Sequence, residues 1–232
     1  MARKVRIAHL YPNELNLYGD SGNILCLQHR LSCRGFSWEI LTVGIGDRLP
    51  DFDILFIGGG QDKEMSIIAP DLRRKAEALN YYIHSGRVVL AICGGYQILG
   101  EYYKDAQGNI IDLCDVLPFF TVAGRSRLIG NIVTDTPFGK VVGFENHSGK
   151  TYLSTDLHPL GTVISGYGNN GEDATEGLLF KNTFCTYCHG PVLPKNPRLA
   201  DELISRALGE EPEPIDDYIE NQCHNAIIKI TK

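Results

Sequence analysis

One cysteine of this sequence stands where a thiol could act as a nucleophile. Cys93 follows the apolar run at 87–92 and is followed at once by Gly94 and Gly95. A buried strand that turns sharply into a helix through glycines is typical of a nucleophile elbow. The free N–H groups at the start of such a helix favour a thiolate and, later, an oxyanion. We therefore expect Cys93 to attack a carbonyl carbon.

A thiol nucleophile needs a base, and the seven histidines of the chain supply the candidates. His189 follows a strand-like run at 183–187, so it should lie at the same sheet edge as the elbow. His147, within the segment 144–149, is the rival. A lone histidine more often fills a core or a surface, and it is the presence of Cys93 that favours a catalytic role for one of the two.

Several short motifs resemble one enzyme family. In class I glutamine amidotransferases, a glutamine that helps to hold the substrate follows the nucleophile by four residues, as Gln97 follows Cys93 here. The triple glycine at 58–60 is similar to the oxyanion loop of that family. Other segments resemble its cobyric-acid-synthase-like branch, and within it the glutaminase subunits of lipid II amidation: 16–23, 58–62, 143–149, 166–170 and 187–196. Their order and spacing carry the resemblance over nearly the whole chain.

The resemblance implies a glutaminase mechanism. Cys93 would attack the side-chain amide of L-glutamine, and backbone N–H groups near Gly59 and Gly94 would hold the oxyanion. His189 would carry a proton to the departing ammonia, and water would hydrolyse the glutamyl thioester. Arg127 is similar to the residue that holds the α-carboxylate of the substrate, a task suited to a guanidinium. Without the resemblance, Arg127 is a solvated surface charge.

The sequence departs from the family at one position. Ordinary class I domains carry a glutamate two residues after the histidine, and here that residue is Pro191. A conventional triad is therefore excluded, as in the cobyric-acid-like branch, which works with a Cys-His pair. Asp20, expected on the loop after the first strand, either orients the imidazole of His189 or only caps the helix that follows.

The resemblance also implies a partner. In the glutaminase subunits of lipid II amidation, which this sequence resembles, the ammonia passes to a MurT-like Mur-ligase subunit. That subunit activates the α-carboxyl of D-glutamate in lipid II with ATP and magnesium. The product is D-isoglutamine in peptidoglycan. We therefore expect a heterodimer, recognition of lipid II through the partner, and no cofactor and no metal on this chain. Amidation of another acceptor, such as cobyrinate, stays open.

Two other functions use the same elbow. A peptidase or a deglycase could use Cys93 as its nucleophile, but neither function explains the presence of Gln97 or Arg127. A subunit that only binds a partner would not need an intact Cys93 and His189.

One cysteine motif has a competing interpretation. Cys185, Cys188 and His189 match the C-x-x-C-H pattern of c-type haem attachment, which requires export. A zinc site at these residues would need a second pair of ligands at a suitable spacing, and the sequence has none. We expect Cys185 and Cys188 to be buried strand residues, with a redox role left open. Lys63 either lies near the mouth of the site or, as we expect, is a solvated loop lysine.

The scaffold for these residues follows from the alternation of elements. Strand-like runs at 5–11, 37–43, 53–57 and 87–92 alternate with helical segments at 21–34, 70–84 and 96–99. This order predicts an α/β, flavodoxin-like fold with a mostly parallel sheet flanked by helices. Glycine-rich turns in the second half predict an antiparallel extension of that sheet.

The end of the chain adds a strand at 183–187, a helix at 197–208 and an amphipathic helix at about 214–230, which should dock on the body. We expect a single domain, 1–232.

The composition restricts the partners and the compartment. The formal net charge is −6 and no long Lys/Arg run occurs, which argues against a nucleic-acid or anionic-membrane surface. No apolar window approaches the roughly 18 residues that a spanning helix needs, and the first residues lack the apolar stretch of a signal peptide. The seven cysteines make a poor disulfide framework. We expect a cytoplasmic protein that meets lipid II at the inner face of the membrane through its partner.

Overall fold

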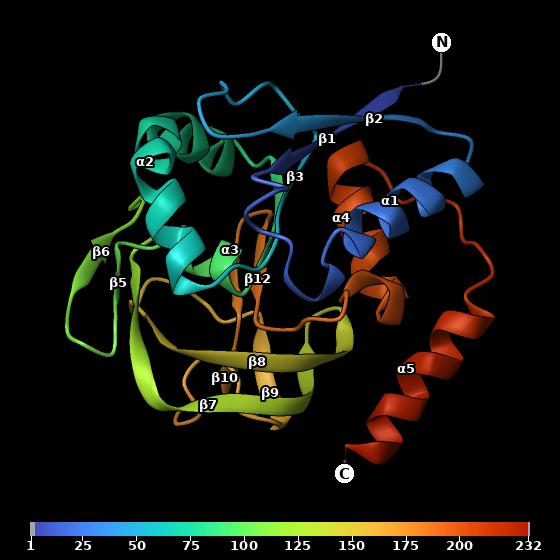
Figure 1. Ribbon diagram of the computed structural model, residues 1–232. Helices are drawn as coiled ribbons and strands as arrows, with labels where there is room; N and C mark the ends of the chain where they lie inside the picture. The colour runs from blue at the N-terminus through green and yellow to red at the C-terminus, as the bar shows by residue number, and fades with distance from the viewer. Residues whose placement is uncertain (1–2, 232) are drawn as a thin grey trace.

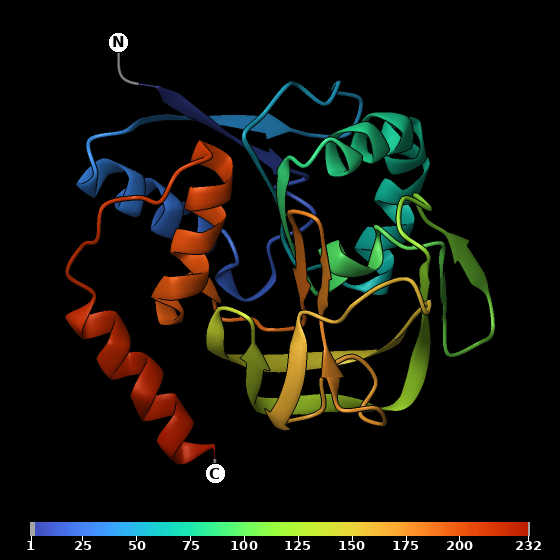
Figure 2. The same cartoon turned by 180° about the vertical axis from the view of Figure 1, so that it is seen from behind.

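The chain folds around two β-sheets (Figures 1 and 2). The computed structural model describes residues 3–231, so residues 1, 2 and 232, the outer ends of the predicted domain, lie outside it. The first sheet has the strand order β11-β12-β4-β3-β1-β2. Its strands are β1 (Lys4–Leu10), β2 (Ser37–Val43), β3 (Ile54–Ile57), β4 (Val88–Ile92), β11 (Leu178–Phe180) and β12 (Thr183–Thr186). All neighbouring pairs are parallel except β11 with β12.

The central strands of this sheet are apolar because they are covered on both faces. Every residue of β3 and β4 is buried, as expected for parallel strands between two layers of helices. Figure 1 shows α2 (Asp62–His84) on one side, and α1 (Gly22–Cys33) with α4 (Pro197–Leu208) on the other. The order β2-β1-β3-β4-β12 is that of flavodoxin-like sheets, so the predicted fold class is confirmed.

Two helices differ from their predicted bounds. The helix expected from residue 70 begins at Asp62, and Pro70 lies inside it. Proline is favoured in the first helical turn and therefore suggested a start at 70, but a capping box between Gln61 and Glu64 starts the helix earlier. The helix expected at 96–99 is α3 (Gly94–Gln97), a single turn directly after Cys93. No helix within residues 3–231 has both the length and the apolarity needed to cross a bilayer.

The mostly antiparallel strands of the second half form a sheet of their own rather than an extension of the first. The strand order of this second sheet is β10-β9-β7-β5-β6, and β8 pairs with β7. The bounds are β5 (Tyr102–Lys104), β6 (Ile110–Asp112), β7 (Phe119–Thr136), β8 (Gly139–Leu153), β9 (Gly161–Ser165) and β10 (Thr175–Glu176). Only β11 adds an antiparallel strand to the first sheet.

The long hairpin of β7 and β8 joins the two sheets. Along β8, Glu145, His147, Gly149 and Thr151 are buried and the residues between them are half-buried, the two-residue period of a strand with one covered face. Phe144 pairs with His189 in an isolated antiparallel bridge. The hairpin therefore runs past the carboxyl ends of the parallel strands.

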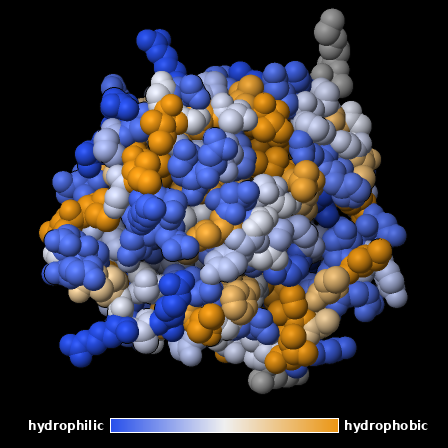
Figure 3. All heavy atoms as spheres, in the orientation of Figure 1, coloured by the Kyte–Doolittle hydropathy of each residue, from blue (hydrophilic) through white to orange (hydrophobic). Residues whose placement is uncertain are grey.

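The C-terminal helix is present but makes less contact than predicted. α5 (Tyr218–Ile230) has no buried residue, and Ile219 and Ile230 are more than two-thirds exposed. In Figure 1 it stands at the side of the molecule, and Figure 3 shows apolar side chains over it. Its attachments are polar: the His224 imidazole contacts the Lys195 carbonyl, and Asp217 accepts a hydrogen bond from the buried Arg30. The helix thus contacts the body at β8 and at Leu193–Lys195, but most of its apolar side chains face outward.

Candidate active site

Cys93 lies at the carboxyl end of β4, as predicted. The register pairs Ile92 with Thr186 of β12, and the Cys93 N–H donates to the Thr186 carbonyl over 2.9 Å. The backbone at Cys93 has φ 49° and ψ −107°, a conformation that L residues rarely adopt. Strain of this kind is characteristic of nucleophile elbows. Because α3 is only one turn long, its dipole is small, and individual N–H groups supply most of the local positive charge.

Two glycine loops pack against each other beneath the thiol. A Cβ atom on Gly94 would lie 2.6 Å from the carbonyl oxygen of Gly60 and 2.7 Å from its nitrogen. Only glycine permits this contact between the elbow and the loop after β3. The loop is thereby held close to the sulfur.

The N–H of Gly59 has a different role from the predicted one. It donates to Oδ2 of Asp20 over 2.8 Å, so it is not free to bind an oxyanion. Within residues 3–231, the N–H groups of Gly60 and Gly94 donate to no protein acceptor. Gly60 therefore replaces Gly59 as the candidate oxyanion donor beside Gly94.

His189 and Asp20 form a buried pair next to the elbow. Neither side chain is exposed, and Nδ1 of His189 lies 3.3 Å from both carboxylate oxygens of Asp20. A carboxylate only accepts hydrogen bonds, so Nδ1 carries the proton and Nε2 remains for the thiol. The alternative role of Asp20 is excluded, because the N-cap of α1 is Ser21 and no side chain caps that helix.

The electrostatics of His189 favour its charged form. Burial by itself lowers the pKa of His189, but the negative charge of Cys93 and the hydrogen bond to Asp20 outweigh burial and raise the pKa to about 10. An imidazolium beside a thiol sulfur stabilises the thiolate.

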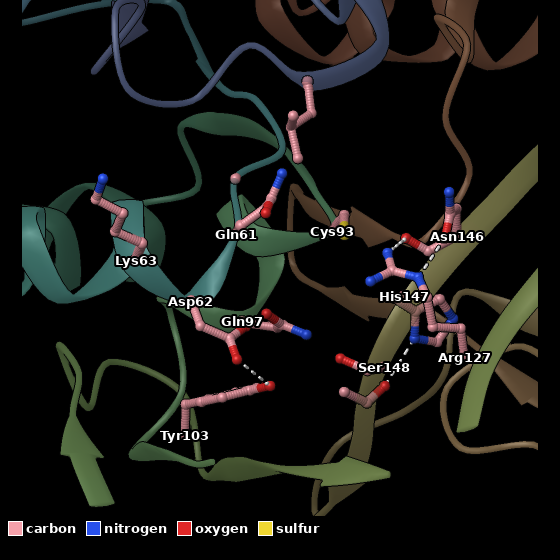
Figure 4. A pocket seen from close by; sticks show the side chains of 13 residues that line it. Gln61, Asp62, Lys63, Cys93, Gln97, Tyr103, Arg127, Asn146, His147 and Ser148 are labelled. Carbon is pink, nitrogen blue, oxygen red and sulfur yellow. Dashed lines mark hydrogen bonds between the residues drawn. The ribbon is translucent and has the colours of Figure 1, made fainter. Parts of the chain in front are cut away.

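A cavity of about 320 Å³ opens at Cys93 (Figure 4). The first sheet contributes loop residues and the hairpin contributes the facing wall. The lining residues are Leu17, Gly60, Gln61, Asp62, Lys63, Cys93, Gln97, Tyr103, Arg127, Asn146, His147, Ser148 and Gly149. Gln97, predicted to hold substrate, is among them, and its Nε2 donates to the hydroxyl of Tyr187 over 3.0 Å.

Arg127 reaches the cavity from an irregularity in the hairpin. The pairing of β7 with β8 breaks between Ala123 and Leu128, and bulged strands of this kind redirect side chains near active sites. Nε of Arg127 donates to Oδ1 of Asn146 over 2.7 Å, and Nη2 donates to the Asn146 carbonyl over 3.0 Å. Arg127 is exposed but held in place on the cavity wall, unlike a freely solvated charge.

His147, the rival base, also lines the cavity but makes other contacts. Its ring lies flat on Tyr187, with centroids 3.6 Å apart, and its Nδ1 lies 2.7 Å from the Gly149 carbonyl. The Tyr187 hydroxyl contacts Oγ1 of Thr151 over 2.6 Å. His147 therefore belongs to a packed wall, where its Nε2 lies 3.7 Å from a carboxylate oxygen of Glu145. His189 has the shorter carboxylate contact, 3.3 Å to Asp20, and lies beside the elbow.

The sequence missed several cavity residues. Asp62 accepts a hydrogen bond from the hydroxyl of Tyr103 over 3.1 Å, and Lys63 lies in the first turn of α2 rather than in a loop. Asn146, which lines the cavity, and Tyr187, whose hydroxyl contacts Gln97, were also given no role, although each stands within two residues of a histidine that the motifs single out. That proximity is the signal that could have found them.

Cys185 and Cys188 are fully buried near the end of β12. Burial raises the pKa of both thiols well above the usual value, which disfavours the reactive thiolate. Within residues 3–231, no three His, Cys, Asp or Glu side chains are grouped so that they could hold a metal ion.

Comparisons with known proteins agree on one family. Residues 6–197 match the CobB/CobQ-like glutamine amidotransferase domain. The chain is 45% identical to the GatD subunit of lipid II isoglutaminyl synthase (glutamine-hydrolyzing) of Streptococcus pneumoniae, over 88% of this chain and 81% of the relative. It is 39% identical to the GatD subunit of Staphylococcus aureus, over 97% and 95%. A solved glutamine amidotransferase has a similar fold, with TM-score 0.60 and 13% identity over 86% of this chain and 98% of the other.

Proposed function

This chain belongs to the CobB/CobQ-like glutamine amidotransferase family, which includes the GatD subunits it resembles over most of its length, and we propose that it hydrolyses L-glutamine for a partner enzyme. The observation that carries the proposal is Cys93 on a strained elbow beside the buried His189–Asp20 pair. A nucleophile, a base and a group that orients the base are the parts that acyl transfer requires.

The chemistry begins at the thiolate. Sγ of Cys93 attacks the side-chain carbonyl carbon of glutamine, and the N–H groups of Gly60 and Gly94 stabilise the oxyanion. The His189 imidazolium gives its Nε2 proton to the departing nitrogen, so ammonia leaves and a thioester forms. His189 then takes a proton from water, which attacks the thioester and releases glutamate and the thiolate.

The charges on the cavity walls suit an amino-acid zwitterion. Arg127 supplies a guanidinium for the α-carboxylate, and Asp62 offers a carboxylate for the α-ammonium group. Figure 4 shows these two side chains on opposite sides of the cavity. Gln97, buried beside Cys93, contacts the side-chain amide.

The partner is a MurT-like Mur-ligase subunit that forms a heterodimer with this chain. The names of the relatives support this step, since GatD is a subunit of lipid II isoglutaminyl synthase. ATP and magnesium act on the partner, which activates the α-carboxyl of D-glutamate in lipid II and receives the ammonia. The product is D-isoglutamine in peptidoglycan, and this chain needs no cofactor of its own.

The test is glutamate release from L-glutamine by the purified chain, with and without a MurT-like subunit. Release by the wild type, its loss in Cys93→Ala and stimulation by the partner are the expected results. Cys33→Ala is the matched control, because Cys33 is an exposed cysteine of α1. Glutamate release that persists in Cys93→Ala would overturn the mechanism. Release that does not respond to the MurT-like subunit would overturn the proposed partnership.

A further inference from the structure

Tyr18 has an unusual backbone for an aromatic residue. It lies in the turn Leu17–Gly19 between β1 and α1, with φ 55° and ψ 23°. Side chains other than those of glycine, asparagine and aspartate rarely adopt this left-handed conformation. Residues held in it cluster at functional sites, where the surrounding structure maintains them.

The side chain of Tyr18 makes two contacts with the site. Its hydroxyl accepts a hydrogen bond from Nδ2 of Asn146 over 2.6 Å. Its ring meets the His189 ring edge-on, with centroids 4.9 Å apart and planes at 67°. The outer part of the ring stays in solvent, since Tyr18 is 47% exposed while the His189 side chain is fully buried.

Asn146 connects Tyr18 to Arg127. Its amide nitrogen donates to Tyr18, while its amide oxygen accepts from Nε of Arg127. One asparagine side chain on β8 therefore joins the loop after β1 to the irregular segment of β7. The chain of contacts therefore runs from His189 through Tyr18 and Asn146 to the Arg127 guanidinium.

The turn does not need the tyrosine side chain to hold its shape. The Leu17 N–H donates to the Gly59 carbonyl and the Asp20 N–H to the Leu17 carbonyl, both over 3.1 Å. Oδ1 of Asn16 accepts from the Ser21 N–H over 2.9 Å. Backbone and asparagine contacts thus fix the turn, and the Tyr18 hydroxyl is left to act on Asn146.

We propose that Tyr18 is a positioning residue for glutamine binding. Through Asn146 it fixes the Arg127 guanidinium in the orientation that receives the α-carboxylate, and its ring covers the imidazole of His189. The inference rests on the proposed glutaminase function, and it adds a residue that contacts neither the nucleophile nor the reacting amide.

The test compares Tyr18→Phe, which loses only the hydroxyl, with Tyr81→Phe, an exposed tyrosine on α2. Tyr18→Phe should raise the KM for glutamine about 5-fold, the usual net effect of one hydrogen bond, and leave kcat within about twofold. Alkylation of Cys93 by iodoacetamide, which has no carboxylate, should keep its rate. Tyr81→Phe should change none of these quantities.

A double-mutant cycle with Asn146→Ala tests the bridge itself. If the two side chains act through one contact, Tyr18→Phe should add nothing in the Asn146→Ala background. Independent, additive effects would overturn the bridge, as would an unchanged KM in Tyr18→Phe together with a raised KM in Arg127→Ala. Failure of the proposed function has a different signature: wild-type glutamate release would not depend on Cys93.

Discussion

The carboxylate of Asp20 lies 3.3 Å from Nδ1 of His189, and both side chains are closed to solvent. The same carboxylate accepts a hydrogen bond from the N–H of Gly59. Asp20 therefore contacts the imidazole and the glycine loop at once. With proline at position 191, Asp20 is the carboxylate that contacts the imidazole.

Asp20→Asn should lower kcat for glutamine by roughly 10²–10⁴-fold, because the amide lacks the negative charge that stabilises the imidazolium and replaces one acceptor oxygen by an NH₂ donor. The pKa of His189 should also fall, since the hydrogen bond to Asp20 raises it. Steady-state kinetics and the pH profile of Cys93 alkylation measure the two effects.

Ser21→Ala is the control for Asp20, because Ser21 is the neighbouring residue and its side chain makes no capping bond. It should keep wild-type kinetics. An Asp20→Asn enzyme with unchanged kcat would remove Asp20 from the mechanism.

Arg127→Ala should raise the KM for glutamine roughly 10- to 100-fold, the usual worth of a charge-assisted hydrogen bond. Arg127→Lys should recover only part of the loss, because a lysine cannot make the fork that holds a carboxylate. Iodoacetamide should still alkylate Cys93 at the normal rate. Arg125→Ala, two residues away in the same irregular segment, is the matched control, and an equal effect there would point to a general field of positive charge.

Cys93→Ala and His189→Ala should each abolish glutamine-dependent amidation by the complex with the ligase and leave ammonia-dependent amidation intact. The reason is that both residues act before ammonia is released. Amidation assays with glutamine or with an ammonium salt separate the two steps. Loss of both activities would mean that the substitutions disrupt the complex rather than the chemistry.

Tyr18→Gly should be more stable than Tyr18→Ala by about 1 kcal/mol, because both variants lack the ring and only glycine is free of the left-handed strain. Urea unfolding gives the difference. Equal stability of the two variants would show that the turn relaxes once the ring is gone.

Glu176 should make the stability depend on pH. It is fully buried, its Oε1 accepts from the Tyr187 N–H and the Thr186 hydroxyl, and burial raises its pKa from 4.5 to about 7. The folded state therefore binds more protons than the unfolded state between these values, so the free energy of unfolding falls as the pH rises through this window.

Glu176→Gln keeps the Oε1 acceptor and removes the titration. The variant should be more stable than the wild type at pH 8, by on the order of 2–3 kcal/mol, and the advantage should vanish near pH 4.5. Urea unfolding at the two pH values measures it, and a difference that does not vary with pH would contradict the argument.

The elements that local patterns specify were predictable from the sequence. The apolar runs of β3 and β4 and the glycines after Cys93 determine the parallel sheet and the elbow within a few residues. The second sheet was not predictable in this way, because β7 pairs with β5 and β9 through contacts between distant segments.

The same limit applies to the site. The engagement of Gly59 depends on a carboxylate 39 residues away, and no spacing rule reveals it. The resemblance to a family pointed to Arg127 and Gln97. Tyr18 and Asn146 lie inside the segments 16–23 and 143–149, but their contact with each other and that of Asn146 with Arg127 appear only in the structure.

The site is divided between the two sheets: Cys93 and His189 follow strands of the first, and Arg127 and Asn146 belong to the hairpin of the second. The hairpin therefore supplies only the Arg127 side of the cavity, while Asp62 and Gln97 lie on helices of the first sheet. Mutations confined to the hairpin would change the guanidinium side of the cavity and leave the elbow intact, so a descendant of this protein could alter that one contact in small steps.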